Sequence, residues 1–203
     1  MRWTTAHRTS PKAGEQDNGD AVFVRPSDDA LTLAVVDGLG HGPMAAAAAA
    51  AAVDCLARQP AAADVEQIMR AIHDVLRGTR GAAMAVCQLR LPTLTGARTT
   101  WLGPEPLELI CCGVGNVEIR CVGAKLPILL SPGVLGARVQ SFRVCRGELP
   151  RGARLVLFSD GISQRAPLDA LRHLDAETLC DTLMREHRKP DDDATVLVCD
   201  TEA

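Results

Sequence analysis

A run of eight alanines, Ala45–Ala52, restricts the fold of this chain more than any other segment. Alanine has the highest intrinsic helix propensity and Pro43 suits a first helical turn, so the sequence predicts a helix from Pro43 to about Arg58. Side chains this small allow a helix to lie very close to a sheet or to another helix. The run is much shorter than the roughly 20 residues that cross a membrane, which favours a packed helix.

The rest of the core must be built from small and aliphatic side chains. The chain has 203 residues, of which 47% are hydrophobic, but only 2% are aromatic and none is Tyr. This length and apolar content suit a single domain, residues 1–203, with a sizeable core. Few aromatic residues, scattered Lys and Arg and a net charge of -3 argue against nucleic-acid binding and against binding to an anionic membrane.

The N-terminus and the cysteines favour a cytoplasmic protein. No apolar segment typical of a secretory signal precedes the first charged and polar residues. The eight cysteines form no C-x-x-C pair and fall mostly in apolar runs. We therefore expect buried free thiols in a reducing compartment.

Hydrophobic patterning predicts an antiparallel α+β architecture. Two β-rich runs, 20–24 and 31–37, are separated by RPSDD and are typical of a hairpin. A helix capped by Asp64 is expected to reach Arg77, with an apolar face made of Val65, Ile68, Met69, Ile72, Val75 and Leu76. Further elements are expected at 82–91, 107–112, 117–122, 138–145 and 154–158 (strands), 176–187 (helix) and 194–200 (strand). Leu91–Pro106 is expected to be a loop around a strand that the pattern does not place.

Aspartates stand at the ends of several predicted strands. Asp20 begins the hairpin and Asp37 ends it, while Asp160 follows one apolar strand and Asp191–Asp193 precede another. Each group alone is typical of an ordinary turn or a solvated loop, but strand ends at one rim of a sheet can bring all four together. Crowded carboxylates without Lys or Arg partners repel one another, and a hard divalent cation such as Mg²⁺ or Mn²⁺ relieves that repulsion.

In chain order, these segments resemble the motif series of the bacterial PPM, or PP2C-like, serine/threonine phosphatases. The matching segments are NGDAV, VVDGLGHGPMAA, GVGNVEIR, LFSDGIS and DDATVLV. The resemblance spans Asp17 to Val198 and is greatest to the subgroup that contains the SpoIIE and RsbX phosphatases. It implies an αββα sandwich, in which two stacked antiparallel sheets are flanked by helices, with a two-metal centre at one end.

The same resemblance implies roles for individual residues. The implied metal ligands are Asp20, Asp37, the Gly38 carbonyl, Asp160 and Asp192, of which Asp37, Asp160 and Asp192 are the candidate catalytic residues. Asp37 would bridge two Mn²⁺ or Mg²⁺ ions, and Asp193 would be a neighbour rather than a ligand. A two-metal centre activates water for in-line attack on phosphorus, so no nucleophilic side chain is needed.

Two positions depart from the larger eukaryotic-type members. Gly19 stands where they have a glutamate ligand, which predicts weaker binding of the second ion. Leu39 stands where they have a histidine, so the acid that protonates the leaving group stays open. His41 acting through water and a metal-bound water are the two alternatives. No arginine that would clamp the phosphate is identifiable from the sequence.

The resemblance implies a metal-dependent phosphatase that acts on phosphoserine or phosphothreonine of a STAS-domain protein in a partner-switching or stressosome pathway. Leu91–Pro106 and Pro127–Ala137 are candidate docking segments. Two alternatives are a catalytically silent PPM-fold binding module and a metal hydrolase of small phosphoesters. The presence of all four metal-site aspartates argues against the first, and the lack of base-recognition groups argues against the second.

Overall fold

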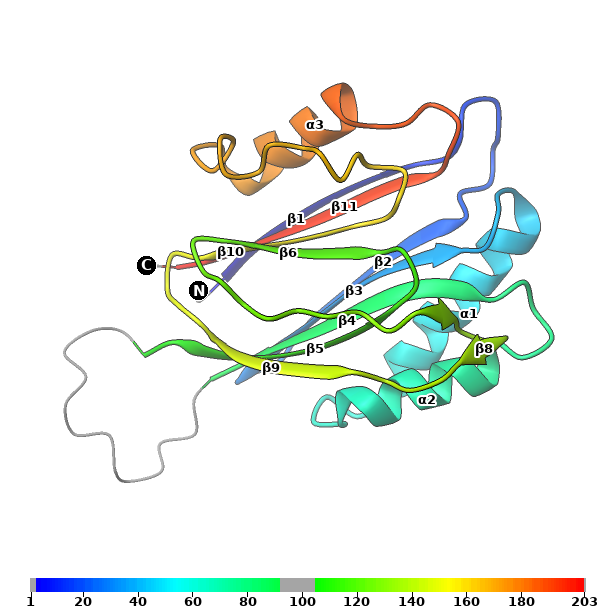
Figure 1. The fold of residues 1–203 in the computed structure, drawn as a ribbon, viewed down its shortest axis with the longest axis horizontal. Coiled ribbons are helices and arrows are strands. Elements are labelled where there is room, and N and C mark those ends of the chain that lie inside the picture. Colours follow the sequence, from blue (N-terminus) through cyan, green and yellow to red (C-terminus); the bar gives the residue numbers. More distant parts are fainter. Residues whose placement is uncertain (1–2, 92–104, 203) are drawn as a thin grey trace.

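The computed structural model describes residues 3–91 and 105–202. Two antiparallel sheets stack face to face, with helices on the outer face of each (Figure 1). The first sheet has the order β1-β11-β10-β6, with strands Trp3–Ser10, Ala194–Thr201, Arg154–Phe158 and Glu118–Val122. The second has the order β2-β3-β4-β5-β9, with strands Asp20–Pro26, Ala30–Gly38, Ala82–Arg90, Leu107–Val114 and Val144–Leu149. These are the αββα layers expected from the sequence.

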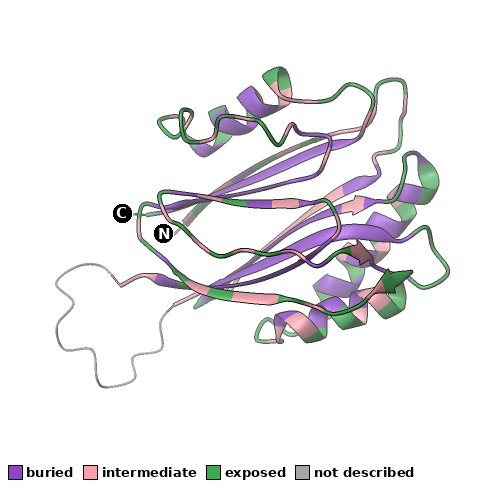
Figure 2. Cartoon of the chain, in the orientation of Figure 1, coloured by how far each residue is buried: buried purple, intermediate pink, exposed green. Residues whose placement is uncertain are grey.

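The helices complete the four layers. Helices α1 (Pro43–Arg58) and α2 (Val65–Val75) pack against the second sheet, and α3 (Ala176–Glu186) packs against the first. A two-stranded ribbon of β7 (Gly133–Val134) and β8 (Arg138–Val139) lies beside the second sheet. Buried apolar side chains form one cluster between the sheets and one under each helical layer, and Figure 2 shows the burial concentrated in the central strands.

Helix α1 has the bounds that the sequence predicts, and its small side chains do allow a close approach. Ala45, Ala48, Ala49 and Ala52 are buried, at the spacing of one helical face. The first turn of α1 lies so close to the end of β3 that a Cβ atom on Gly38 would overlap the Ala45 carbonyl. The alanine run therefore places the start of a helix directly against the strand end that carries Asp37.

Three sequence expectations about the elements are wrong. The expected strand 138–145 is instead two strands, β8 and β9, because residues 140–143 lie outside both and pairing with β5 starts only at Val144. Strand β1 was not expected, since Ala6 is its one buried residue and an edge strand carries little apolar signal. The helix expected to reach Arg77 ends at Val75, which is 45% exposed, and the buried position falls to its C-cap residue Leu76. Most of Leu91–Pro106 lies outside the described residues.

All eight cysteines are free thiols, as expected. Six are buried, whereas Cys121 and Cys145 are partly exposed. Within residues 3–91 and 105–202, no helix is both long enough and apolar enough to cross a membrane.

Candidate metal centre

The β2–β3 hairpin brings Asp20 and Asp37 together. They are directly opposite each other in the antiparallel pairing, at the open end of the hairpin. The six residues before Asp37 are all buried, so an apolar strand fixes the backbone that carries this carboxylate. The Gly38 N–H donates to the Gly19 carbonyl at 2.9 Å, which fixes the chain just beyond the pair. Both carboxylates are thus held at one rim of the second sheet.

The first sheet reaches the same rim through Ser159 and Thr195. The Ser159 N–H donates to the Thr195 carbonyl at 3.0 Å, and the Thr195 N–H donates to Ser159 Oγ at 2.9 Å. Ser159 Oγ in turn donates to Asp20 Oδ2 at 2.5 Å and so joins the two sheets at this end. Asp160 and the run Asp191–Asp193 flank these two residues. The structure therefore brings together the four aspartate groups that the sequence singled out.

Asp193 holds the rim together through backbone amides. Its Oδ1 accepts from the Lys12 N–H at 2.8 Å and its Oδ2 accepts from the Gly19 N–H at 3.0 Å. A side chain at Gly19 would collide with Asp193 Oδ2 and with the Ala45 side chain. The glutamate of the larger phosphatases therefore has no room here. Both carboxylate oxygens of Asp193 already accept hydrogen bonds from backbone amides. This fits a residue beside a metal site better than a metal ligand.

Burial and mutual repulsion raise the pKa of several of these carboxyls. Burial, then the negative charges of Asp20, Asp160, Asp192 and Asp193, raise the pKa of Asp37 to about 8. Burial raises the pKa of Asp20 to about 7, although the Ser159 hydrogen bond opposes the shift. Burial and then Asp160 raise the pKa of Asp192. No Lys or Arg side chain of the described residues pairs with any of these carboxylates, so a cation would relieve the repulsion.

Asp160 has a separate set of supports that sequence reasoning missed. Asn116 Nδ2 donates to Asp160 Oδ2 at 2.5 Å, and Lys189 Nζ donates to the Asp160 carbonyl at 2.5 Å. A Cβ on Gly161 would overlap the Asp193 carbonyl, so only glycine allows the two turns to approach this closely. Asn116 belongs to the GVGNVEIR motif, which was the one available signal for it.

The glycine-rich turn after Asp37 carries a histidine and is touched by an arginine. His41 is exposed, and its Nδ1 lies 2.9 Å from Glu15 Oε1 in an ion pair when the ring is protonated. Arg80 precedes β4 and donates from Nη1 to the His41 carbonyl at 3.4 Å. Its guanidinium pairs with no carboxylate among the described residues. Arg80 is thus a cationic group beside the glycine-rich turn that the sequence did not identify.

The residues at the rim fit hard divalent cations by their chemistry. Carboxylate and carbonyl oxygens are the ligands that Mg²⁺ and Mn²⁺ prefer, and the crowding of negative charge favours a cation. Within the described part of the chain, however, no three His, Cys, Asp or Glu side chains are already arranged to hold an ion. Asp20 is turned to Ser159, Asp160 to Asn116 and Asp193 to backbone amides. Each of these three carboxylates therefore already accepts a hydrogen bond from a protein group.

One segment has the C-x5-R spacing of cysteine-dependent phosphatases. It runs from Cys145 to Arg151. Its first five residues belong to the extended strand β9, and Arg151 Nε donates to the Glu105 carbonyl at 2.9 Å. An extended strand does not form the loop of backbone amides that cradles a phosphate. The segment therefore offers no cysteine-based phosphatase site.

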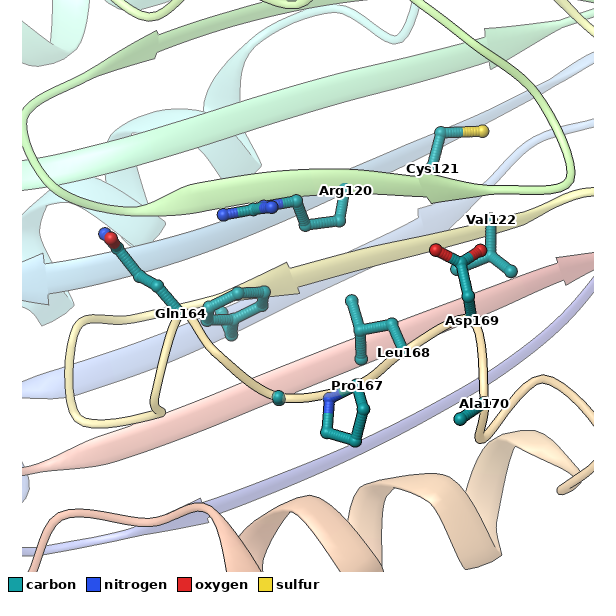
Figure 3. A pocket seen from close by; sticks show the side chains of 10 residues that line it. Arg120, Cys121, Val122, Gln164, Pro167, Leu168, Asp169 and Ala170 are labelled. Carbon is teal, nitrogen blue, oxygen red and sulfur yellow. The ribbon is translucent and has the colours of Figure 1, made fainter.

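A hollow of about 380 Å³ lies away from the aspartates, between strand β6 and the segment Gln164–Ala170 (Figure 3). Arg120 and Val122 line it from the strand, and Leu168 and Asp169 line it from the segment. None of the aspartates at the rim contributes to this hollow.

The comparisons with known proteins agree with this fold. The family model described as "Stage II sporulation protein E (SpoIIE)" matches residues 27–202. The chain is 26% identical over 155 residues to "Phosphoserine phosphatase RsbX" of Bacillus subtilis (strain 168), covering 75% of this chain and 71% of that protein.

Two solved structures share almost the whole fold. A chain of the structure described as "The bacterial stressosome: a modular system that has been adapted to control secondary messenger signaling" is 30% identical, with a TM-score of 0.85 over 98% of this chain and 100% of that one. The structure of RsbX in complex with magnesium is 21% identical, with a TM-score of 0.83 over 100% of this chain and 96% of that one.

The stacked sheets, the helical layers and the aspartates gathered at one end of the sandwich define a phosphatase of the PPM, or PP2C-like, class. This class works with divalent metal ions. Within it, the chain belongs to the SpoIIE family, whose model matches most of its length.

Proposed function

We propose that this phosphatase acts in the cytoplasm and removes phosphate from phosphoserine or phosphothreonine of a STAS-domain regulator in a partner-switching or stressosome pathway. The observation that carries the chemistry is the convergence of buried aspartates without a cationic partner. The pathway is supported by the likeness to RsbX, named as a phosphoserine phosphatase, and to a chain of a stressosome structure. Eight free cysteines are consistent with a reducing compartment.

The proposal treats residues 1–203 as one PPM-type domain. It is supported by the pairing of β1 with β11, which joins the two ends of the described chain in one sheet. The cluster between the sheets also draws side chains from strands at both ends, among them Leu33 and Leu197.

The proposed metal ligands are Asp20, Asp37, the Gly38 carbonyl, Asp160 and Asp192. We assign two Mn²⁺ or Mg²⁺ ions to this site. The ion on the side of Gly19 would bind more weakly, because glycine supplies no side-chain ligand there. Ions at such a centre lower the pKa of water and draw negative charge from a phosphoryl group. The role of Asp37 is supported by its position opposite Asp20 in one sheet and by the nearby charges of Asp160 and Asp192, which adjoin strands of the other sheet.

The chain's own residues have distinct tasks in this proposal. Asn116 and Lys189 hold the Asp160 turn from both sides, so they position a ligand rather than contact the substrate. Arg80 is exposed beside the glycine-rich turn and can bind a phosphoryl oxygen from there. His41 is a candidate to protonate the departing seryl or threonyl oxygen through water, and its Nδ1 lies 2.9 Å from Glu15 Oε1.

The shape of the site favours a folded substrate over a small ester. The hollows of about 380 and 400 Å³ on the two sides of β6 are not lined by the rim aspartates. Beyond Asp37, Leu39 in the glycine-rich turn and Met44 in the first turn of α1 are 48% and 57% exposed. A protein surface that presents a phosphorylated side chain can reach such a rim. Pro127–Ala137 remains a proposed docking segment, and Leu129 within it is 59% exposed.

The test is a comparison of substrates. The enzyme with Mn²⁺ is incubated with a kinase-phosphorylated STAS protein and, separately, with an unrelated phosphoserine peptide and a small aryl phosphate. We expect the phosphorylated STAS protein to lose phosphate at least about tenfold faster than the peptide, as docking contacts outside the reacting group would produce. Asp37→Asn is the inactive control.

The three candidate functions give different outcomes. Equal rates on protein and peptide would reject the STAS assignment while keeping the phosphatase. Hydrolysis confined to the small ester would favour the small-phosphoester hydrolase. Binding of the phosphorylated STAS protein with no loss of phosphate at saturating Mn²⁺ would favour the silent binding module.

A further inference from the structure

Three cysteines lie side by side across the second sheet, far from the aspartate rim. Cys87 of β4 is directly opposite Cys111 of β5, and Cys111 is directly opposite Cys145 of β9. The three adjacent strands are seen together in Figure 1. All three side chains belong to the cluster between the sheets, so they point to the same face. Each neighbouring pair is thus a cross-strand thiol pair.

The pair Cys111–Cys145 has the spacing that a disulfide needs. Directly opposite residues of an antiparallel pair have Cα atoms about 4.5–5.5 Å apart. A disulfide spans Cα separations of about 4.4–6.8 Å, so the backbone needs little movement to close the bond. Cys111 and Cys145 also line the same small hollow of about 10 Å³, together with Leu126 and Ile128, so their side chains face one common space.

The two thiols differ in access, which sets the order of reaction. Cys145 is partly exposed on the edge strand β9, and its Sγ accepts from the Leu129 N–H at 3.3 Å. Cys111 is only 1% exposed and Cys87 is fully buried. A hydrogen bond from the Cys87 thiol and another from the Cys145 thiol lower the pKa of Cys111, although burial opposes this shift. A thiol that loses its proton more readily is the better attacking group.

Cys121 offers a natural contrast within the same protein. It is the other partly exposed cysteine, on the edge strand β6, but the residue opposite it is Leu155. Burial raises the pKa of its thiol. Both thiols are partly exposed, so exposure does not distinguish Cys145 from Cys121. The difference is that Cys145 has a second thiol directly opposite it and Cys121 does not.

We propose that Cys145 and Cys111 form a reversible redox site whose oxidant is a peroxide. The Cys145 thiolate attacks one oxygen of hydrogen peroxide, the O–O bond breaks, and a sulfenic acid and hydroxide result. The Cys111 thiolate then attacks the Cys145 sulfur, the S–O bond breaks, and hydroxide leaves as the disulfide forms. Two thiols have lost two electrons and two protons, and one peroxide has become two waters. A dithiol reductant reverses the reaction by thiol–disulfide exchange.

The experiment uses the purified full-length chain without substitutions. The reduced protein is treated with hydrogen peroxide, free thiols are alkylated under denaturing conditions, and the digest is mapped by mass spectrometry. We expect a Cys111–Cys145 linkage that disappears on treatment with dithiothreitol. Oxidation spread equally over Cys121 and Cys145, or a linkage that joins Cys87 to Cys111 instead, would overturn the proposal.

Three single substitutions sharpen the result. Cys111→Ser should leave Cys145 as a sulfenic acid that dimedone traps, because no thiol remains opposite it. Cys145→Ser should slow the loss of free thiols at least about tenfold, because the partly exposed thiol of the pair is gone. Cys121→Ser is the matched control and should leave linkage and rate unchanged. A Cys145→Ser protein that folds and loses thiols at the rate of the original chain would contradict the inference.

Discussion

The helix that starts at the aspartate rim and the helix on the opposite face of the molecule are built differently. Helix α1 has no side-chain N-cap, follows Gly42 at a φ of 77°, and buries mostly alanines. Helix α3 begins after Asp175, which accepts from the Thr178 N–H at 2.9 Å, and buries Leu179 and Leu183. The remote helix therefore has the cap and the large apolar side chains that usually stabilise a helix.

This difference indicates what the site requires of its surroundings. At α1, the first turn lies so close to Gly38 that a Cβ there would overlap the Ala45 carbonyl, and the positive φ of Gly42 disfavours the usual cap residues. Helix α3 packs on β1 and β11 with an ordinary cap and large apolar side chains, so the two helices differ in how far the site constrains them. Changes on the two helices should consequently separate activity from stability.

Removal of the metal should have the largest effect on activity of all the changes considered. Its effect on the structure should be confined to the aspartate rim, where α1 begins. We expect hydrolysis of an aryl phosphate to require Mn²⁺ or Mg²⁺, to be abolished by a chelator and to return when the ion is restored. Amide hydrogen exchange in α3 should be unchanged by the chelator. Activity that resists chelation would contradict the metal proposal.

Asp37→Asn should lose at least about 100-fold in activity, because it removes the carboxylate proposed to lie between the two ions. The apo protein should be as stable as the original or more stable, since asparagine removes a carboxyl whose ionised form is disfavoured by burial and by the neighbouring aspartates. Steady-state hydrolysis and thermal unfolding without metal measure the two effects. A variant that melts several degrees lower without metal would indicate a structural role for Asp37.

Ala48→Leu should destabilise the fold by about 1–3 kcal/mol, because added methylene groups in a packed interface force the helix away. Ala48 is fully buried against the second sheet, so the shift should also reduce activity. Ala47→Leu, at an exposed position of the same helix, is the control and should be close to neutral. Urea unfolding and aryl phosphate hydrolysis test both expectations. Equal stability of the two variants would show that α1 does not pack as closely as described.

Arg80→Ala should raise KM by about tenfold with a smaller change in kcat, if the guanidinium binds a phosphoryl oxygen of the bound substrate. Arg77→Ala is the matched control, because Arg77 pairs with Asp74 at 3.1 Å on the helix surface. Kinetics over a range of substrate concentrations separate the two parameters. A KM like that of Arg77→Ala would remove Arg80 from the site.

Asp175→Ala should have the smallest effect and should spare activity altogether. Loss of an N-cap carboxylate typically costs about 1 kcal/mol of stability. Thermal unfolding and kcat are compared with those of the original chain. A lower kcat measured where the variant is fully folded would show that the α3 layer is coupled to the rim.

Local signals explain which parts of the fold are predictable from sequence. The bounds of α1 follow from Pro43 at its start and from Gln59 and Pro60 at its end, all adjacent in the chain. The aspartates were found for the same reason, because each adjoins a strongly apolar strand. Strand β1 was missed since its pairing partner, β11, lies almost the whole chain away.

The contacts that complete the site are long-range, and the sequence carries little sign of them. Ser159 reaches Asp20 across 139 residues, and Asn116 reaches Asp160 across 44. Arg80 lies beside the glycine-rich turn because β3 pairs with β4. Such contacts depend on how the sheets stack, which no local pattern encodes. The roles of the aspartates as ligands stay predictions until a metal is measured.

The position of β11 between β1 and β10 has a consequence for how the protein is made. On the ribosome, β1 emerges before the other described strands and has no strand to pair with until β11, Ala194–Thr201, has been synthesised. The second sheet can pair in the order of synthesis, but the first sheet has to wait for its central strand. We therefore expect the Asp20–Ser159 contact, and with it the rim, to form only after translation of β11, in a step slowed by large sequence separation.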